Sequence, residues 1–75
     1  MDERETLIRT CEWCAQERKR LKATLADIND NPPMSVEEFE DWHETRQYLI
    51  ELLAGLQQYH AINRFRARGL GLNLP

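Results

Sequence analysis

The two cysteines of this chain, Cys11 and Cys14, stand three residues apart in a C-x-x-C arrangement. Such a pair can supply thiolate ligands to zinc or form a thioredoxin-type redox site. Zinc needs four ligands, and no second C-x-x-C or finger-spaced histidine pair is present. A redox pair should follow a strand, whereas this one lies inside a helical pattern. We therefore expect two small buried apolar residues and no metal or other cofactor; zinc shared between two protomers is the alternative.

Two arginines, Arg18 and Arg46, occupy positions where the helical pattern predicts apolar residues. Two guanidinium groups cannot be buried together without carboxylates, because removing each ion from water is costly. Three interpretations remain open. Both side chains reach solvent at the helix edge, or they form a polar layer that specifies the register of a dimer, or they bind an external anion or acidic partner.

The histidines, His43 and His60, together with Glu44, suggest acid–base chemistry only if a cleft exists to hold a substrate. A helical pattern of this kind predicts no such cleft. We expect both histidines at the rim of the helix contact, and we expect the protein not to be an enzyme.

The elements that must position these residues are two long helices. The first segment has a stripe in steps of three and four residues, which together with good helix formers predicts a helix over about residues 3 to 29. Asp2, with Glu5 three residues later, is its expected N-cap. The stripe consists of Leu7, Cys11, Cys14, Arg18, Leu21, Leu25 and Ile28.

The second helix is expected over about residues 36 to 68, after a turn in "NDNPPMS". Ser35 and Glu38 form a capping-box pattern at its start, and Gly69 is a natural left-handed stop. Gly55 interrupts the helix and is interpreted as the mark of a close helix contact. The second stripe consists of Phe39, Trp42, Arg46, Leu49, Leu53, Leu56 and His60.

The predicted fold is all-α: an antiparallel helical hairpin over residues 1–68, followed by an extended tail over residues 69–75. If the turn centres on Pro32, the numbers of facing residues sum to about 64. That register places Arg18 opposite Arg46 and Leu21 near Trp42. It also sets the basic run 18–22 beside the acidic run 40–44, a weak electrostatic preference for this pairing.

The second helix carries more apolar surface than the first can cover, which predicts a homodimer that forms a four-helix bundle. Trp13 lies off the first stripe and is expected to be exposed or to anchor an interface. The alternatives are scattered surface aromatics and a disordered tail. The predicted partner-binding residues are Trp13, Tyr48, Tyr59, Phe65, Leu70 and Leu72; Leu74 continues the alternation of the tail.

Composition limits the function further. The chain has 75 residues and a formal net charge of −3, which argues against general nucleic-acid affinity. An acidic start without a following apolar segment is unlike a signal peptide, so we expect a soluble cytoplasmic protein. The predicted function is a non-enzymatic interaction module that regulates, inhibits or sequesters a protein partner. The alternative is nucleic-acid binding by the basic end of the second helix, through Arg64, Arg66 and Arg68.

Overall fold

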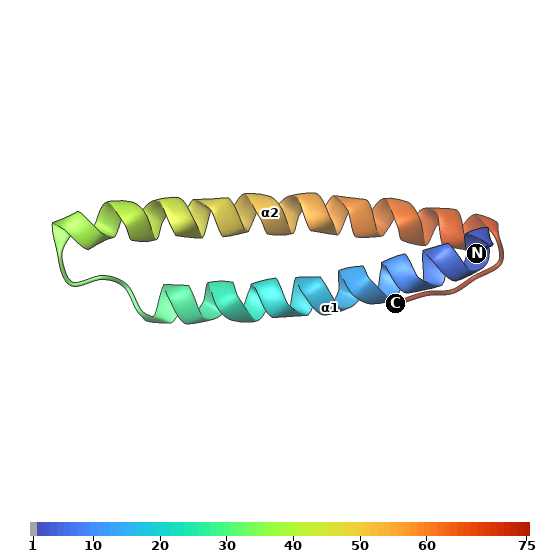
Figure 1. The fold of residues 1–75 in the computed structure, drawn as a ribbon, viewed down its shortest axis with the longest axis horizontal. Helices are drawn as coiled ribbons and strands as arrows, with labels where there is room; N and C mark the ends of the chain where they lie inside the picture. The colour runs from blue at the N-terminus through green and yellow to red at the C-terminus, as the bar shows by residue number, and fades with distance from the viewer. Residues whose placement is uncertain (1) are drawn as a thin grey trace.

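The computed structural model describes residues 2–75, which form two long helices, α1 (Glu3–Asp30) and α2 (Val36–Gly69). The helices lie antiparallel and side by side in a rod of 52 × 18 × 15 Å (Figure 1). No strand occurs within residues 2–75. The predicted all-α hairpin is therefore confirmed, and each helix agrees with its predicted bounds to within one residue. Residue 1 of the predicted domain lies outside the described residues.

Both helices begin at the predicted N-caps. The Asp2 Oδ1 atom accepts a hydrogen bond of 2.8 Å from the Glu5 amide. The Ser35 Oγ atom accepts one of 3.3 Å from the Glu38 amide. Each bond satisfies an amide that has no partner within the first turn of its helix, which is why short polar side chains are favoured at these positions.

The stop signal of α2 is at Gly71 rather than at the predicted Gly69, which is still helical. Gly71 has φ of 79°, a left-handed conformation that glycine adopts without a Cβ clash. The amide of Gly71 donates to the Arg68 carbonyl, and that of Leu72 to the Ala67 carbonyl. This is the Schellman pattern, which satisfies two carbonyls at the helix end and turns the chain back.

The predicted register of the two helices is wrong. Trp42 Nε1 donates to the Ile28 carbonyl at 3.0 Å, so Trp42 lies two turns nearer the end of α1 than predicted. Arg18 lies beside His60, about four helical turns beyond its predicted partner Arg46. Both pairings are displaced in the same direction.

The path of the loop explains the displacement. Asn31 has φ −125° and ψ 64°, and Ser35 is extended, so the chain continues past the end of α1 before α2 begins. The first turns of α2 consequently extend beyond α1, as Figure 1 shows. Phe39, predicted on the buried stripe, lies on this overhang and is 51% exposed. The acidic run 40–44 begins there too, away from the basic run of α1.

The core of the hairpin is narrow and lies toward the end that holds both termini. The predicted stripe of α1 is confirmed: four of its residues are buried, and Arg18, Leu25 and Ile28 are half-buried. In α2 the stripe continues past His60 to two residues whose polar or small side chains concealed it in the sequence. The buried residues are Leu7, Cys11, Cys14 and Leu21 from α1, and His60, Asn63 and Ala67 from α2.

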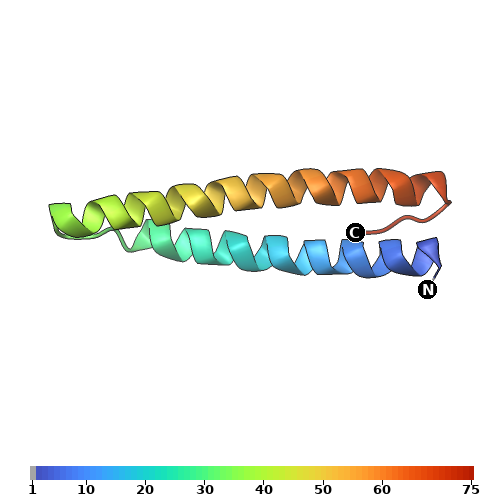
Figure 2. The ribbon, with the colours of Figure 1, turned by 45° about the horizontal axis from the view of Figure 1, so that its top comes forward.

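The tail over residues 70–75 runs back along the hairpin from the end of α2 (Figure 2). Leu70, Leu72 and Leu74 are each half-buried, because the alternation turns these side chains toward the helices. The tail therefore covers part of the hairpin's own surface. Neither helix in residues 2–75 has an apolar stretch long enough to cross a membrane.

Candidate functional site

The seam between the helices divides the surface of the hairpin into two flanks. Successive residues of a helix are about 100° apart, so Trp13 and Lys22 lie on opposite sides of α1. In α2, Tyr59 and Arg64 are about 140° apart by the same rule. Trp13 and Tyr59 line a groove on one flank, whereas Lys22 and Arg64 line a cleft on the other.

The apolar groove is the concave surface lined by Trp13 of α1 with Leu52, Gly55, Leu56 and Tyr59 of α2, and Glu51 stands at its edge. Trp13 is 54% exposed, Leu52 44% and Tyr59 50%, so each presents about half of its side chain to solvent. Tyr48 and Ile62, both exposed, extend the same side of α2 because they lie one turn before Leu52 and one turn after Tyr59.

Gly55 does not mark a contact between α1 and α2, contrary to the sequence-based interpretation. A Cβ atom placed there would meet nothing within 4 Å. Because glycine has no side chain, the backbone of α2 is exposed at the middle of the apolar groove. Its presence has no explanation in the packing of the hairpin itself.

The structure brings together only some of the predicted partner-binding residues. Trp13, Tyr48 and Tyr59 lie on the flank of the apolar groove. Phe65 is 74% exposed but is about 120° around α2 from Tyr59, outside the groove. Leu70 and Leu72 are half-buried in the returning tail rather than presented to solvent.

The basic cleft is the concave surface lined by Ala15, Arg18, Lys19, Lys22, His60, Arg64 and Pro75. His60, predicted at the rim of the helix contact, is instead 2% exposed. Its Nδ1 atom is 3.0 Å from Arg18 Nη1, and its Nε2 atom is 2.7 Å from the Pro75 oxygen. A guanidinium can only donate, so Nδ1 accepts, the proton is on Nε2, and the imidazole is neutral. His43, by contrast, is exposed.

Two donors of the basic cleft have no acceptor. The Nε atoms of Arg18 and Arg64 are both buried and without a hydrogen-bond partner. An N–H group buried without an acceptor loses its bond to water and gains none in return. Both atoms lie beneath the surface of the cleft, and residues 2–75 leave them without an acceptor.

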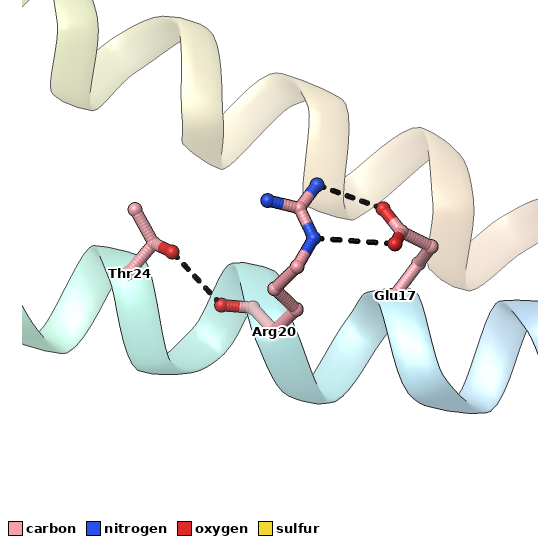
Figure 3. Close-up of polar contacts among 3 residues, drawn as sticks. All are labelled: Glu17, Arg20 and Thr24. Carbon is pink, nitrogen blue, oxygen red and sulfur yellow. Dashed lines mark hydrogen bonds and ion pairs between the residues drawn. The ribbon is translucent and has the colours of Figure 1, made fainter.

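The acid nearest in sequence to these arginines belongs to the other flank. Glu17 lies one turn after Trp13 on the same side of α1, and it forms a bidentate pair with Arg20 at 2.8 and 3.2 Å (Figure 3). This hydrogen bond lowers the pKa of Glu17. Thr24 Oγ1 donates to the Arg20 carbonyl in the next turn. Within residues 2–75 this is the only ion pair between side chains, so no side-chain carboxylate pairs with the four cations of the basic cleft.

Arg18 and Arg46 do not share a layer of the hairpin. Arg46 Nε donates to Asn29 Oδ1 at 2.6 Å, about 16 Å along α1 from Arg18. The displaced register separates them. The structure thus joins Arg18 to Arg64 and the two lysines, and it leaves Arg46 near the loop.

The three arginines of the nucleic-acid alternative do not lie on one face. Steps of two residues turn a helix by about 200°, so Arg66 lies opposite Arg64 and Arg68. Arg64 is half-buried in the basic cleft, whereas Arg66 and Arg68 are exposed. The basic end of α2 is therefore a ring of charge rather than a single positive face.

Cys11 and Cys14 are fully buried and form no disulfide, which confirms their predicted place on the seam. Burial raises the pKa of both thiols. At Cys11 the Arg64 charge opposes this effect; at Cys14 the neighbouring Cys11 adds to it and Arg18 opposes it. Residues 2–75 contain no group of three His, Cys, Asp or Glu side chains placed to hold a metal ion.

Sequence reasoning missed the roles of Lys19, Lys22 and His60 in the basic cleft. Ala15, Lys19 and Lys22 follow the spacing i, i+4, i+7, so they form one stripe beside the seam. That signal was available in the sequence. What it faces depends on the register, which brought Arg64 and His60 rather than acids to this flank.

Neither a protein-family model, nor a curated protein, nor a solved structure matches this chain.

Proposed function

We propose that this protein is a small non-enzymatic interaction module. It self-associates through the apolar groove into a four-helix bundle, and in that form it binds a protein partner and regulates, inhibits or sequesters it. The observation that carries the proposal is the apolar groove, in which Trp13, Leu52 and Tyr59 stand half-exposed beside each other.

The thin core supports self-association. Only seven of the described residues are buried, and two of these, His60 and Asn63, are polar. A chain of this length buries a small share of its surface, and isolated helical pairs rarely supply a sufficient core. Covering the groove with a second apolar surface would add the burial that the hairpin lacks.

Gly55 supports close packing of another helix against the groove. Glycine in a helix interior costs about 1 kcal/mol relative to alanine. Nothing within the hairpin uses the space at this position. A second helix that crosses α2 at Gly55 can approach the α2 backbone more closely than it could at a residue with a side chain.

The charge of α2 favours a second copy of the chain as the occupant. On the side of α2 that carries Gly55, the acidic Glu44 lies near one end and Arg66 near the other, with Gly55 midway between them. If two α2 helices pack antiparallel about Gly55, Glu44 of one lies near Arg66 of the other. Each such exposed pair contributes little free energy. In a parallel arrangement Glu44 would instead lie near Glu44 and Arg66 near Arg66, so the charges favour the antiparallel arrangement.

The non-enzymatic part of the proposal is supported by the histidines. Both ring nitrogens of His60 are engaged, by Arg18 and by the Pro75 oxygen. His43 is exposed on the overhang, where its ring stacks on Phe39 with centroids 6.1 Å apart. Neither imidazole has a nitrogen held against a neighbouring nucleophile, as acid–base catalysis would require.

Sedimentation equilibrium of the full chain and two variants tests self-association. Leu52→Glu places a charge in the groove and should produce a monomer at concentrations where the unchanged chain is a dimer. Phe65→Ser, outside the groove, is the matched control and should remain dimeric. A monomeric unchanged chain at every accessible concentration would contradict the proposal, as would a dimer that Leu52→Glu leaves intact.

Capture of a partner is tested separately, with the same three proteins as baits. A partner that binds the dimer should be retained by the unchanged chain and by Phe65→Ser, and lost with Leu52→Glu. Equal retention by all three baits would show that partner binding does not depend on the groove.

A further inference from the structure

The tail of residues 70–75 is bound to the hairpin as a peptide ligand would be. It runs back along the helices from the end of α2 (Figure 2). Leu70 lies beside Arg4 at the start of α1, and Pro75 lines the basic cleft with Ala15. An extended segment from Leu70 to Pro75 spans about 17 Å, and α1 rises about 17 Å from Arg4 to Ala15. The tail therefore follows α1 in an extended conformation over about three helical turns.

A polar anchor holds the end of the tail. Arg18 donates to Nδ1 of His60 at 3.0 Å, which leaves the imidazole proton on Nε2. Nε2 in turn donates to the Pro75 oxygen at 2.7 Å. Because His60 is 2% exposed, the tail supplies the acceptor that this buried donor needs. The hairpin thus holds one donor in place for one oxygen of an extended segment.

The apolar part of the tail has the pattern by which extended peptides are recognised. Leu70, Leu72 and Leu74 are each half-buried, and alternate side chains of an extended segment point the same way. On α1, Ile8 and Ala15 are half-buried and seven residues apart, which places both on the side that the tail follows. Sites for extended peptides combine a few fixed polar contacts with apolar surface for every second side chain.

The tail is held by few bonds. Within residues 2–75, the amides of residues 70–72 complete the end of α2, and beyond them the backbone of the tail makes one hydrogen bond, to His60. Gly71, in its left-handed conformation, joins the tail to α2 and can change its backbone angles without a Cβ clash. A half-buried segment with so few bonds opens at a small fraction of the free energy of global unfolding. The surface beneath the tail can therefore be vacated while the hairpin stays folded.

We propose that the surface under the tail, termed the tail site, is a peptide-binding site. Its ligand is an extended segment of a partner protein with leucine at alternate positions and a carboxylate at its end. The chain's own tail is an internal competitor that this segment displaces. The inference rests on the proposed binding of a protein partner but needs no self-association, because Pro75 lies on the flank opposite the apolar groove.

The cations of the basic cleft set the preference for a carboxylate. Pro75 brings its own carboxylate to the cleft, where no side-chain carboxylate competes for the cations. Positive charges attract a carboxylate and not a neutral amide at this position. Charge therefore fixes which end of the segment enters the cleft, and the leucines fix its register. The cations at this end of the tail site are Arg18, Lys19, Lys22 and Arg64.

The experiment uses the peptide GLGLNLP, which has the sequence of residues 69–75, and the full ¹⁵N-labelled chain. A tethered tail competes at an effective concentration of about millimolar, so the unchanged chain should bind the peptide weakly. The variant Leu72→Ser, Leu74→Ser weakens the internal competitor and should bind the peptide about tenfold more tightly or better, because its own tail has lost apolar contacts. NMR should show the ring signals of His60 in this variant moving saturably toward their positions in the unchanged chain. No saturable movement, or an equal movement of the Trp13 indole signal, would overturn the proposal.

Two altered peptides separate the tail site from general attraction. GLGNLLP has the same composition without the alternation, and it should bind the double variant about tenfold more weakly than GLGLNLP. Equal affinity of these two peptides would refute the site. GLGLNLP with a C-terminal amide lacks the negative charge and should also bind more weakly than the free acid. Equal affinity of acid and amide would refute the role of the carboxylate.

Further variants of the full chain guard against misfolding and against an effect of self-association. Met34→Ser, Val36→Ser removes two exposed apolar side chains from the overhang and should leave the peptide affinity within about twofold of that of the unchanged chain. A gain as large as that of the tail variant would assign the effect to loosened folding and refute the site. Leu74→Ala alone releases the tail less and should give an intermediate affinity, so the proposal is tested even where the double variant unfolds. Addition of Leu52→Glu should leave peptide binding unchanged, and a loss would contradict the independence of the tail site from self-association.

Discussion

The two flanks of the hairpin share one seam but are incomplete in different ways. On the apolar flank the surplus is area: carbon surface around Trp13 and Tyr59 whose burial is favourable in proportion to its extent and has no preferred direction. On the basic flank the surplus is a pair of N–H groups on Arg18 and Arg64 that need acceptors at particular positions. A large, shape-matched surface satisfies the first need, whereas the second is met only by an acceptor placed directly at each N–H group.

This difference shows how a thin two-helix chain can present two unlike surfaces. Each helix has one buried stripe, and each side of that stripe faces a different flank. Because Trp13 and Lys22 lie on opposite sides of α1, a substitution on one flank should leave the other unchanged. The following predictions test that independence.

The largest effect is expected from Leu21→Ala, since Leu21 is 4% exposed and lies on the seam beneath both flanks. Removing a buried leucine costs about 2–5 kcal/mol, a large part of the stability of a small domain. Urea denaturation should show this loss, and self-association should fall with it. Val36→Ala on the overhang is the control and should change the unfolding free energy by less than about 0.5 kcal/mol. If self-association kept its full affinity in Leu21→Ala, the apolar flank would not depend on the seam.

Gly55→Ala should act in opposite directions on folding and on self-association. The added methyl group meets nothing within the hairpin, so the monomer should gain about 1 kcal/mol from helix propensity. Denaturation in the monomeric Leu52→Glu background measures this gain. In the otherwise unchanged chain the same methyl group should weaken the dimer, as sedimentation would report. A dimer strengthened by Gly55→Ala would argue against close packing at this position.

A pH-dependent effect is expected from the two cysteines. Burial raises the pKa of Cys11 and Cys14 above the usual 9.0, so at high pH the unfolded chain loses thiol protons that the folded chain retains. The contribution of the two buried thiols to the unfolding free energy is unchanged below about pH 9 and is progressively lost as the pH rises above that value. The unfolding free energy should therefore decline from pH 9 upward. In a Cys11→Ala, Cys14→Ala variant, the share of this decline that the thiols cause should be absent; an unchanged slope would contradict the assignment.

The smallest effect is expected from Glu17→Gln, which breaks the exposed pair with Arg20 (Figure 3). The pKa of Glu17 is lowered by this hydrogen bond, so its stabilising contribution is present above the usual value of 4.5 and disappears as the pH falls through the lowered value. At neutral pH the urea midpoint should change by less than in the other variants, because water screens an exposed pair. A fall as large as that of Leu21→Ala would contradict this assignment.

Local features of this fold could be predicted from the sequence with good accuracy. The steps of three and four residues placed Leu7, Cys11, Cys14 and Leu21 on a seam, and all four are buried. The N-caps at Asp2 and Ser35 follow from side chains that bond amides three residues ahead. These features depend on neighbours within one or two turns of the same helix.

The candidate sites were predicted only in part. Trp13 and Tyr59 were expected at an interface, and they do line one groove; Phe65 and the tail leucines do not join them. The basic cleft was not foreseen beyond Arg18, because the assumed turn paired that arginine with Arg46 instead of bringing Arg64 to its flank.

Periodicity in the sequence determines which residues of each helix turn toward a neighbour, because a side chain's direction follows from its position along its own helix. The tertiary structure decided what those residues meet. An extended loop of a few residues carried α2 past the end of α1, and that displacement buried His60, exposed Phe39 and set the acidic start of α2 apart from the lysines of α1. No local pattern encodes such a displacement, since it depends on the path of the loop and on the combined burial of both stripes.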